Sequence, residues 1–333
     1  MLKNPPSIKI IIGLIILCSL NLLMVSSVAP NLLFKQTIVW FLGIILYVAG
    51  TQINPKHISP QKSVIFIVSC IFLLLPIILG NFTRGSRRWL YLGPLSVQPS
   101  EIVKGPLMLF LSTTTMPLLH LIPVAIIMLQ PDLGSAITVF ILIIPIILYN
   151  KKLLKLSIIA GIVFVLLSPL AYKYILKDYQ KQRIDHFINP NSDPLGQGYN
   201  LIQSQIAIGS GGFFGKGYRK GTQSQLLFLP EKHSDFIFAA TSEELGLFSV
   251  ILIIGSYFLI LNSLLNKAFQ TTNNLPLFLF TLGITFEIWT QCSVNIGMNL
   301  GLLPVTGIPL PFMSVGGSSI MALLFSLGII YSA

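Results

Sequence analysis

Long apolar segments, interrupted by short polar ones, dominate this sequence. Windows of about 20 mainly apolar residues are what a bilayer-spanning helix requires, because roughly 30 Å of hydrocarbon is crossed at 1.5 Å per residue. The apolar windows predict ten transmembrane helices. We place them at residues 8–28, 37–53, 64–79, 102–113, 118–129, 133–148, 153–175, 236–261, 275–296 and 311–330. The pattern therefore predicts an all-α, polytopic integral membrane protein.

The fourth to sixth predicted helices are short and contain prolines. Inside a helix, proline removes a backbone hydrogen bond and clashes with the preceding turn, so we expect kinked or broken central helices around a polar cavity. The prolines in question are Pro106, Pro117, Pro123, Pro131 and Pro145. We treat residues 1–333 as a single transmembrane domain with one long, polar, turn-rich extracellular loop at 176–234.

Composition supports the membrane class and excludes a soluble one. Hydrophobic residues make up 53% of the 333 positions and charged residues only 9%, too few for the surface of a soluble domain of this size. The net charge of +11 comes from basic residues placed between apolar segments. That placement favours membrane lipids or lipid phosphates as partners and argues against nucleic acid. The three cysteines lie in apolar runs without CxxC spacing, so neither a disulfide framework nor a zinc site is indicated.

Basic residues in alternate short loops predict the orientation of the chain. Cytoplasmic loops are enriched in Lys and Arg, and the loops in question carry Lys3, Lys9, Lys56, Lys62, Lys151, Lys152, Lys155 and Lys267. The opposite side also carries basic residues, in the segment around 84–88 and in the long loop. Those groups suggest anion binding on the outer face, although long loops are translocated largely regardless of charge.

The densest group of ionisable residues is the motif Phe228-Leu-Pro-Glu-Lys-His-Ser-Asp-Phe-Ile-Phe238. It places Glu231, Lys232, His233 and Asp235 at the start of an apolar span. Ionisable groups beside a membrane-spanning segment are costly, so a functional site is the default hypothesis.

Glu243 and Glu244 follow that motif inside the span. Adjacent helical residues cannot both face one way. We therefore expect at least one of the two to be structural, in a buried pair or a bond between helices.

Three shorter motifs combine charge with turn chemistry. The first motif is Arg84-Gly-Ser-Arg-Arg-Trp-Leu-Tyr91, which places Arg87, Arg88 and Trp89 at the outer membrane boundary. These residues would either bind an anion or form an aromatic belt with arginines that extend to the membrane surface. In Gln98-Pro-Ser-Glu-Ile-Val-Lys104, Glu101 and Lys104 are spaced for an ion pair on one helix face, directed at the protein interior or a water-filled cavity. Asp132 in Gln130-Pro-Asp-Leu-Gly134 is expected to be structural and to cap the next helix.

A glycine-rich segment, Gly209-Ser-Gly-Gly-Phe-Phe-Gly-Lys-Gly217, does not fit the phosphate-binding P-loop. The P-loop pattern requires glycine where Ser210 stands and a hydroxyl residue where Gly217 stands. Backbone amides together with Lys216, Arg219 and Lys220 could still hold a pyrophosphate, and the alternative is a turn without ligand. No metal-ligand spacing such as HExxH occurs, so no metal residues are assigned.

Several of these motifs, in this order, resemble the SEDS family (shape, elongation, division, sporulation). The resemblance extends over roughly residues 40–333 and includes Glu243-Glu-Leu-Gly and Gly301-Leu-Leu-Pro-Val-Thr-Gly-Ile-Pro-Leu-Pro-Phe312 with its Gly-Gly-Ser-Ser tail. Val305-Thr-Gly-Ile-Pro-Leu-Pro311 has the form of the RodA branch rather than of FtsW or SpoVE. One departure is Met313, where the family usually carries an aromatic residue before the glycines.

The resemblance implies a peptidoglycan glycosyltransferase. Such an enzyme polymerises lipid II at the outer face of the bacterial cytoplasmic membrane during cell-wall elongation, and works with a class B penicillin-binding protein and other elongation-machinery membrane proteins. The essential residue of the family matches Asp235, which we assign as general base for an inverting transfer. Undecaprenyl pyrophosphate would leave toward basic groups, and a divalent cation could assist.

The remaining site residues take supporting roles in this scheme. We expect Glu101, Lys104, Glu231 and His233 to support Asp235, and Trp89 to line the groove for lipid or sugar. The groups expected to bind substrate or pyrophosphate are Arg87, Arg88, Lys216, Arg219, Lys220 and Lys232.

Two other functions compete with this assignment. The same cavity and charges would suit a lipid II flippase, which has less need of a catalytic carboxylate and should show polar access on both faces. A non-catalytic scaffold for the transpeptidase would account for the packing but not for the charged motif at 231–235.

Overall fold

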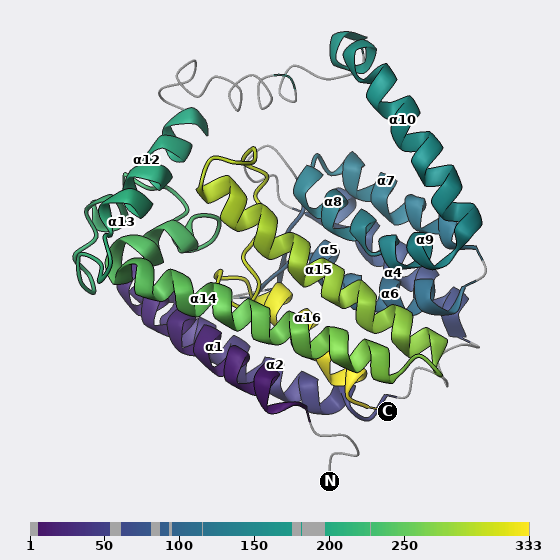
Figure 1. Cartoon of the computed structure of the whole chain (residues 1–333), viewed down its shortest axis with the longest axis horizontal. Helices are drawn as coiled ribbons and strands as arrows, with labels where there is room; N and C mark the ends of the chain where they lie inside the picture. The colour runs from purple at the N-terminus through teal and green to yellow at the C-terminus, as the bar shows by residue number, and fades with distance from the viewer. Residues whose placement is uncertain are drawn as a thin grey trace.

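The computed structural model describes residues 6–53, 61–80, 87–92, 95–114, 116–174, 181, 197–226 and 228–332. These residues form a predominantly helical bundle with one small β-hairpin (Figure 1). The helices in the first half are α1 (Ile8–Val28), α2 (Leu33–Gly50), α4 (Lys62–Leu79), α5 (Pro99–Ile102), α6 (Lys104–Thr113), α7 (Leu121–Leu129), α8 (Leu133–Ile141), α9 (Ile144–Tyr149) and α10 (Lys151–Tyr174). Those in the second half are α12 (Gln197–Ser210), α13 (Thr222–Gln225), α14 (Ile237–Gln270), α15 (Leu275–Asn299) and α16 (Gly317–Ile330). The all-α membrane class predicted from the sequence is confirmed.

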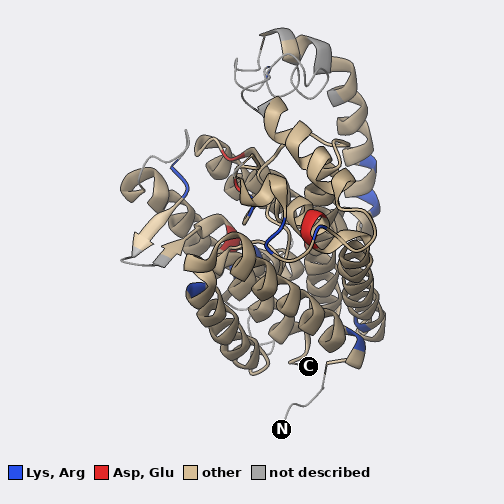
Figure 2. Ribbon diagram, turned by 90° about the vertical axis from the view of Figure 1, so that its left-hand side faces the viewer, with Lys and Arg blue, Asp and Glu red and all other residues tan. Residues whose placement is uncertain are grey.

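Five apolar segments within the described part of the chain are long enough to cross a bilayer. Four of them are the helices α1, α4, α14 and α15, and the fifth joins the 3-10 turn at Pro30–Leu32 to α2. Their sequences are overwhelmingly apolar. Figure 2 shows that Lys, Arg, Asp and Glu occupy only a few short stretches of the described ribbon.

The central helices are broken as their prolines predict. The predicted helix at 102–113 corresponds to α6, which the short helix α5 precedes with a break at Val103. The one predicted at 118–129 consists of a 3-10 turn at Pro117–His120 followed by α7. The predicted helix at 133–148 is divided into α8 and α9, and Pro145 occupies the first turn of α9. Proline is tolerated in a first turn, where its missing N–H would have no partner in any case.

Two boundaries differ clearly from the prediction. The last helix begins at Gly317 rather than at 311, because the preceding segment forms a turn in which the amides of Met313 and Ser314 donate to the carbonyl of Leu310. Helix α14 continues to Gln270, nine residues beyond the predicted end at 261, since Leu264, Leu265 and Phe269 prolong its apolar pattern.

The sequence patterns also missed short elements between the spans. Strands β1 (Leu90–Leu92) and β2 (Leu95–Val97) form an antiparallel hairpin, and helices α12 and α13 lie within the predicted long loop. The first part of that loop, at 176–180 and 182–196, lies outside the described residues, as do Arg84, His57 and His186.

The helix packing brings distant parts of the sequence together. The start of α1 lies near the end of α14, while Ser27 at the other end of α1 bonds to Glu244 near the start of α14, so the two helices run antiparallel. Helix α16 crosses α2 closely: a Cβ on Gly50 would lie 2.5 Å from the carbonyl oxygen of Phe325. Small residues permit this approach, as in other membrane helix pairs. Figure 1 shows α14 and α15 side by side across the middle of the molecule.

Helix α14 is kinked at Gly246, where φ is 72° and ψ is −168°. This backbone conformation is essentially restricted to glycine. The kink frees backbone groups, and the glycine-rich segment at 212–217 satisfies them. The amides of Leu247 and Phe248 donate to the carbonyls of Gly212 and Phe213 at 2.9 and 3.2 Å. In return, the amides of Lys216 and Gly217 donate to the carbonyls of Glu243 and Glu244 at 2.9 and 3.0 Å. The glycine-rich segment is therefore part of the helix break.

Gly246→Ala is expected to destabilise the protein by at least roughly 2 kcal/mol, because the added Cβ would overlap the backbone of Gly215 and Phe213 at a strained φ. Gly255→Ala in the same helix is the matched control, since its Cβ would meet nothing within 4 Å. Thermal unfolding of the detergent-solubilised protein measures the difference, and equal melting temperatures for the two variants would contradict the assignment of the kink.

Candidate active site

A tight turn immediately before α14 carries Asp235. Glu231 has a left-handed φ of 53°, and its carbonyl accepts from the amides of Ser234 and Phe236 at 3.0 and 3.3 Å. The side chain of Glu231 accepts from the Ser234 hydroxyl at 3.1 Å. The turn therefore closes on itself and presents Asp235, which is half-buried, at the amino end of α14. A negative charge is favoured there by the helix dipole.

Two asparagine side chains of α15 hold this turn by its backbone. The amide groups of Asn295 and Asn299 each donate to the carbonyl oxygen of Asp235, both at 3.1 Å. Asn295 also donates to the carbonyl of Ile308 at 2.8 Å. Because both asparagines are buried, the position of Asp235 is tied to the core of the bundle rather than to a free loop.

The segment at 301–316 supports the same turn from the other side. The Val315 amide donates to the carbonyl of His233 at 2.9 Å, and the Ser314 hydroxyl donates to that of Ser234 at 2.6 Å. Gly307 has a φ of 70°, and a Cβ on it would lie 3.7 Å from Oδ2 of Asp235. The two longest motifs of the sequence therefore meet at the Asp235 carboxylate.

Another motif reaches the same segment from α8. A Cβ on Gly134 would lie 2.6 Å from the carbonyl of Thr306 and 3.1 Å from Ile308, the two neighbours of Gly307. The segment is thus enclosed between Gly134 and Asp235.

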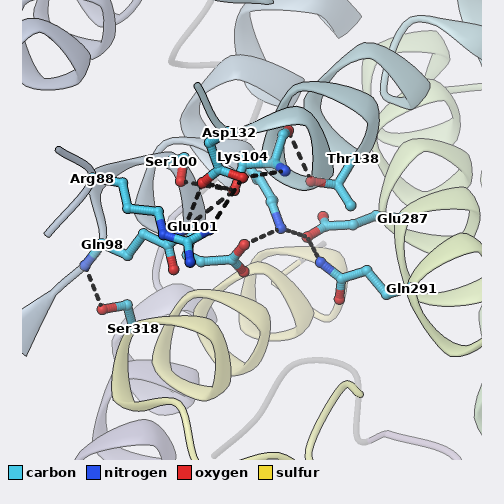
Figure 3. Close-up of polar contacts among 11 residues, drawn as sticks. Arg88, Gln98, Ser100, Glu101, Lys104, Asp132, Thr138, Glu287, Gln291 and Ser318 are labelled. Atoms are coloured by element: carbon cyan, nitrogen blue, oxygen red, sulfur yellow. Dashed lines mark hydrogen bonds and ion pairs between the residues drawn. The ribbon is translucent and has the colours of Figure 1, made fainter. Parts of the chain in front are cut away.

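Asp132, two residues before Gly134, occupies the N-cap position of α8. It accepts from the Ser135 amide at 3.1 Å, as expected for a cap. Figure 3 shows its surroundings: Arg88 Nη1 lies 3.5 Å from Asp132 Oδ1, and Gln98 Nε2 donates to Oδ2 at 3.2 Å. The backbone amide of Gln98 donates to the hydroxyl of Ser318 at 3.0 Å, which ties this group to α16.

A second buried cluster lies beside the first (Figure 3). Lys104 Nζ is 2.7 Å from Glu101 Oε1 and 3.5 Å from Glu287 Oε1 of α15, and all three side chains are at most 5% exposed. The ion pair expected between Glu101 and Lys104 is therefore present. Its further partner is Glu287 of α15, the helix that also carries Asn295 and Asn299.

Helix α15 carries one polar face that links the two clusters. Glu287, Gln291, Asn295 and Asn299 are spaced four residues apart, and Gln291 donates to Glu287 at 3.5 Å. Residues with this spacing lie on one side of a helix, so Glu287 and Asn295 are separated by roughly 12 Å along its axis. Gln291, Asn295 and Asn299 were missed in the sequence, although a four-residue polar repeat in an apolar span is a readable signal.

Glu243 and Glu244 bind the segment at 216–225. Both are fully buried. Glu243 accepts from Lys216 Nζ at 2.7 Å and from the amides of Gln223 and Ser224 at 2.8 and 2.9 Å. The expected buried pair is present, but the two side chains do not diverge. Both reach this one segment, because α13 begins beside them.

Glu244 binds groups from two other parts of the chain. It accepts from the Ser27 hydroxyl of α1 at 2.6 Å, from the side chain of Gln225 at 2.7 Å and from the amide of Arg219 at 3.0 Å. It therefore joins α1 to the segment at 216–225.

The basic residues predicted to bind pyrophosphate fall into two groups. Lys216 is paired with Glu243, and Arg219 Nη2 donates to the carbonyl of Ser26 at 2.7 Å, so both fasten the loop to the bundle. Lys220 and Arg87 are exposed. Their binding of a phosphate stays a prediction.

The remaining predicted residues lie around the Asp235 turn and the hairpin. Lys232 Nζ donates to the carbonyl of Ser224 and so connects the turn to α13. Burial lowers the pKa of Lys232, and the charge of Glu244 opposes that shift. His233 and Trp89 are half-buried.

Some buried polar atoms have no hydrogen-bond partner among the described residues. They include Arg88 Nε and Thr306 Oγ1. Arg88 is the residue paired with Asp132, and Thr306 is the residue whose backbone lies against Gly134. Buried polar groups normally have partners, so such atoms are candidates for contacts with a ligand. No group of three or more His, Cys, Asp and Glu residues within the described ranges is arranged to hold a metal ion.

Fold and site together define a helical integral membrane protein whose polar centre is assembled from five separate sequence motifs. The chain belongs to the cell cycle protein family of FtsW, RodA and SpoVE, whose sequence pattern it matches over residues 6–333. This confirms the resemblance found in the sequence.

Named relatives and solved structures agree with the family. The chain is 34% identical to the peptidoglycan glycosyltransferase MrdB of Escherichia coli strain K12, with 99% of this chain and 92% of that protein covered. It is 31% identical to the probable peptidoglycan glycosyltransferase FtsW of Legionella pneumophila, covering 94% and 84%.

Two solved structures share the fold. A chain from a peptidoglycan synthase complex that coordinates polymerization and crosslinking has a TM-score of 0.84 at 28% identity, covering 98% of this chain and 96% of that one. The rod shape determining protein RodA of Thermus thermophilus has a TM-score of 0.71 at 26% identity with the same coverage.

Lys104→Met is expected to destabilise the protein by about 3–5 kcal/mol, because it leaves Glu101 and Glu287 buried without a counter-charge. Combining it with Glu101→Gln should recover part of the loss. Thermal or denaturant unfolding in detergent checks both variants, and a loss below about 1 kcal/mol in the single variant would show that the cluster does not need its cation.

Proposed function

We propose that this protein is a peptidoglycan glycosyltransferase that joins lipid II disaccharide units, with Asp235 as the general base. The enzyme class is supported by family membership over nearly the whole chain and by the names of relatives at 31–34% identity. The role of Asp235 rests on one observation: two other parts of the chain, α15 and the segment at 301–316, converge to hold its turn.

The way in which the Asp235 turn is held suits a catalytic base better than a carboxylate with a purely structural role. Glu243 and Glu244 are fully buried and accept several hydrogen bonds each, which is how structural carboxylates in an apolar bundle are stabilised. The backbone of Asp235 is fixed by Asn295 and Asn299, and its side chain lies in a half-buried position beside Gly307, where a substrate can approach it. A base is most effective when its backbone is fixed and its oxygen atoms are accessible.

The reaction is a displacement at the anomeric carbon of the donor. Asp235 accepts the proton of the acceptor sugar 4-hydroxyl as that oxygen bonds to the anomeric carbon. The bond from this carbon to the lipid pyrophosphate then breaks, the configuration inverts, and undecaprenyl pyrophosphate leaves as an anion. Positive charge stabilises such a leaving group without donating a proton.

Arg88 is the basic residue best placed to contribute that charge, because its Nε has no partner in the described region and Asp132 orients its guanidinium. Lys220 and Arg87 are exposed and would attract the pyrophosphate from a distance.

The setting of the reaction is also part of the proposal. The lysine-rich loops predicted at the end of the bundle opposite Asp235 support an active site on the outer face of the bacterial cytoplasmic membrane. A class B penicillin-binding protein would then crosslink the glycan as it forms. The likeness to a chain from a peptidoglycan synthase complex supports such a partner.

Asp235→Asn is expected to lower polymerisation by roughly 10²–10⁴-fold, the usual contribution of a general base, while leaving the fold intact. The assay gives the purified protein, with its transpeptidase partner, labelled lipid II in detergent and measures glycan polymer. Asp235→Glu serves as the partial-recovery control, and thermal unfolding verifies that each variant is folded.

Undiminished polymer from Asp235→Asn would remove this residue from the mechanism. Absence of polymer from the unsubstituted protein, together with normal lipid II transfer across vesicle membranes, would favour the flippase instead.

Asn295→Ala is expected to reduce kcat about tenfold with little change in KM, since one hydrogen bond to the Asp235 turn contributes about 1 kcal/mol or more when lost from a buried site. Asn262→Ala, near the other end of α14, is the control. Equal kcat for the two variants, measured in the lipid II assay, would show that α15 does not position the base.

A further inference from the structure

A pocket lies at the end of the bundle farthest from Asp235. It is formed by the start of α1, the last turns of α14 and Tyr331 after α16, and its volume is about 320 Å³. That volume is at the lower end of the range for small-molecule sites. Lys267 lies 32 residues beyond Asp235 along the chain, which corresponds to roughly 45 Å along α14, so this pocket is separate from the candidate active site.

The lining of the pocket is basic. Lys9 and Lys267 are among its residues, and no Asp or Glu is. Lys267 Nζ stands 5.5 Å from the centre of the Tyr331 ring, which orients the ammonium group. The described lining of the pocket therefore includes two basic side chains and no acidic one.

Two buried hydroxyl groups complete the polar wall. Ser263 and Tyr331 are each only 4% exposed, and their hydroxyls lie 3.3 Å apart. The Ser7 hydroxyl at the start of α1 is also bonded to Ser263. Hydroxyls beside ammonium groups are typical donors to phosphate oxygens.

The position of the pocket points to a lipid rather than a soluble ligand. It sits where two membrane-spanning helices end, which is the level of lipid headgroups. Apolar side chains continue from its rim along the outside of the bundle. Ile8, which lines the pocket, is 68% exposed, and Phe269 is 65% exposed. An acyl chain could lie against these residues while the headgroup enters the pocket.

We propose that this pocket binds the phosphate of an anionic phospholipid headgroup from the membrane leaflet at the amino-terminal end of the bundle. Basic pockets between helices at a membrane surface have this chemistry, and two lysines favour a headgroup with net negative charge over a zwitterionic one. The ligand differs in place and kind from the lipid-linked sugar at the active site, so the inference does not depend on the proposed reaction.

The test uses the full-length protein in a neutral detergent. Its thermal unfolding is followed while phosphatidylglycerol, phosphatidylcholine or inorganic phosphate is added. We expect phosphatidylglycerol to raise the melting temperature in a saturable way, with a much smaller effect of the other two. This comparison needs only the unsubstituted protein.

Variants then locate the site. Lys9→Gln and Lys267→Gln should each weaken phosphatidylglycerol binding about fivefold, because each basic residue near a membrane surface contributes about 1 kcal/mol. Lys151→Gln combined with Lys152→Gln is the matched control, since these lysines are exposed at the start of α10 and do not line the pocket.

Three results would overturn the proposal. They are equal effects of phosphatidylglycerol and phosphatidylcholine, equal protection by inorganic phosphate alone, and unchanged binding in the combined Lys9→Gln and Lys267→Gln variant.

Discussion

The structure depends above all on the cost of leaving a polar group unpaired inside an apolar bundle. Such a group costs several kcal/mol in hydrocarbon, so each buried charge or broken helix must meet a partner from elsewhere in the chain. Lys104 therefore lies between Glu101 and Glu287, and the kink of α14 is closed by the glycine-rich segment. These obligatory partners, more than apolar contact, determine how the helices are registered against one another.

The same requirement explains the form of the candidate active site. The buried amides of Asn295 and Asn299 find their acceptor in the backbone carbonyl of Asp235, and so fix the turn that carries it. Gly307 leaves space beside the Asp235 side chain. In the proposed reaction, this space is where the acceptor sugar would approach the carboxylate.

Much of the fold was readable from the sequence because its signals are local. Apolar windows located the long spans, prolines located the breaks between α5 and α9, and the spacing of Glu101 and Lys104 predicted their ion pair. The short elements were not predicted because they are too short for a periodic pattern of apolar and polar residues. The β-hairpin has only three residues in each strand, too few for an alternation to be recognised.

The rest of the site was not readable because it is made of contacts between distant residues. No residue close to Lys104 in the sequence indicates that Glu287 is its second partner. From the sequence alone, Lys216 is a candidate phosphate ligand, whereas in the structure it is paired with Glu243. The amides of α15 were overlooked for another reason. Asparagine and glutamine carry no charge, so their burial in an apolar span costs less than that of an ionisable group and marks a site less clearly, although the four-residue polar repeat is present.

The kink at Gly246 has a mechanical consequence. It divides α14 into a short outer piece at 237–245 and a long membrane-spanning piece, and backbone hydrogen bonds attach the glycine-rich segment to both sides of the break. The outer piece, its two buried glutamates and α13 are thus bound to one another as a unit that begins beside Asp235. Because α15 and the segment at 301–316 hold the Asp235 turn itself, the carboxylate keeps its place beside Gly307 although the helix that follows it is broken.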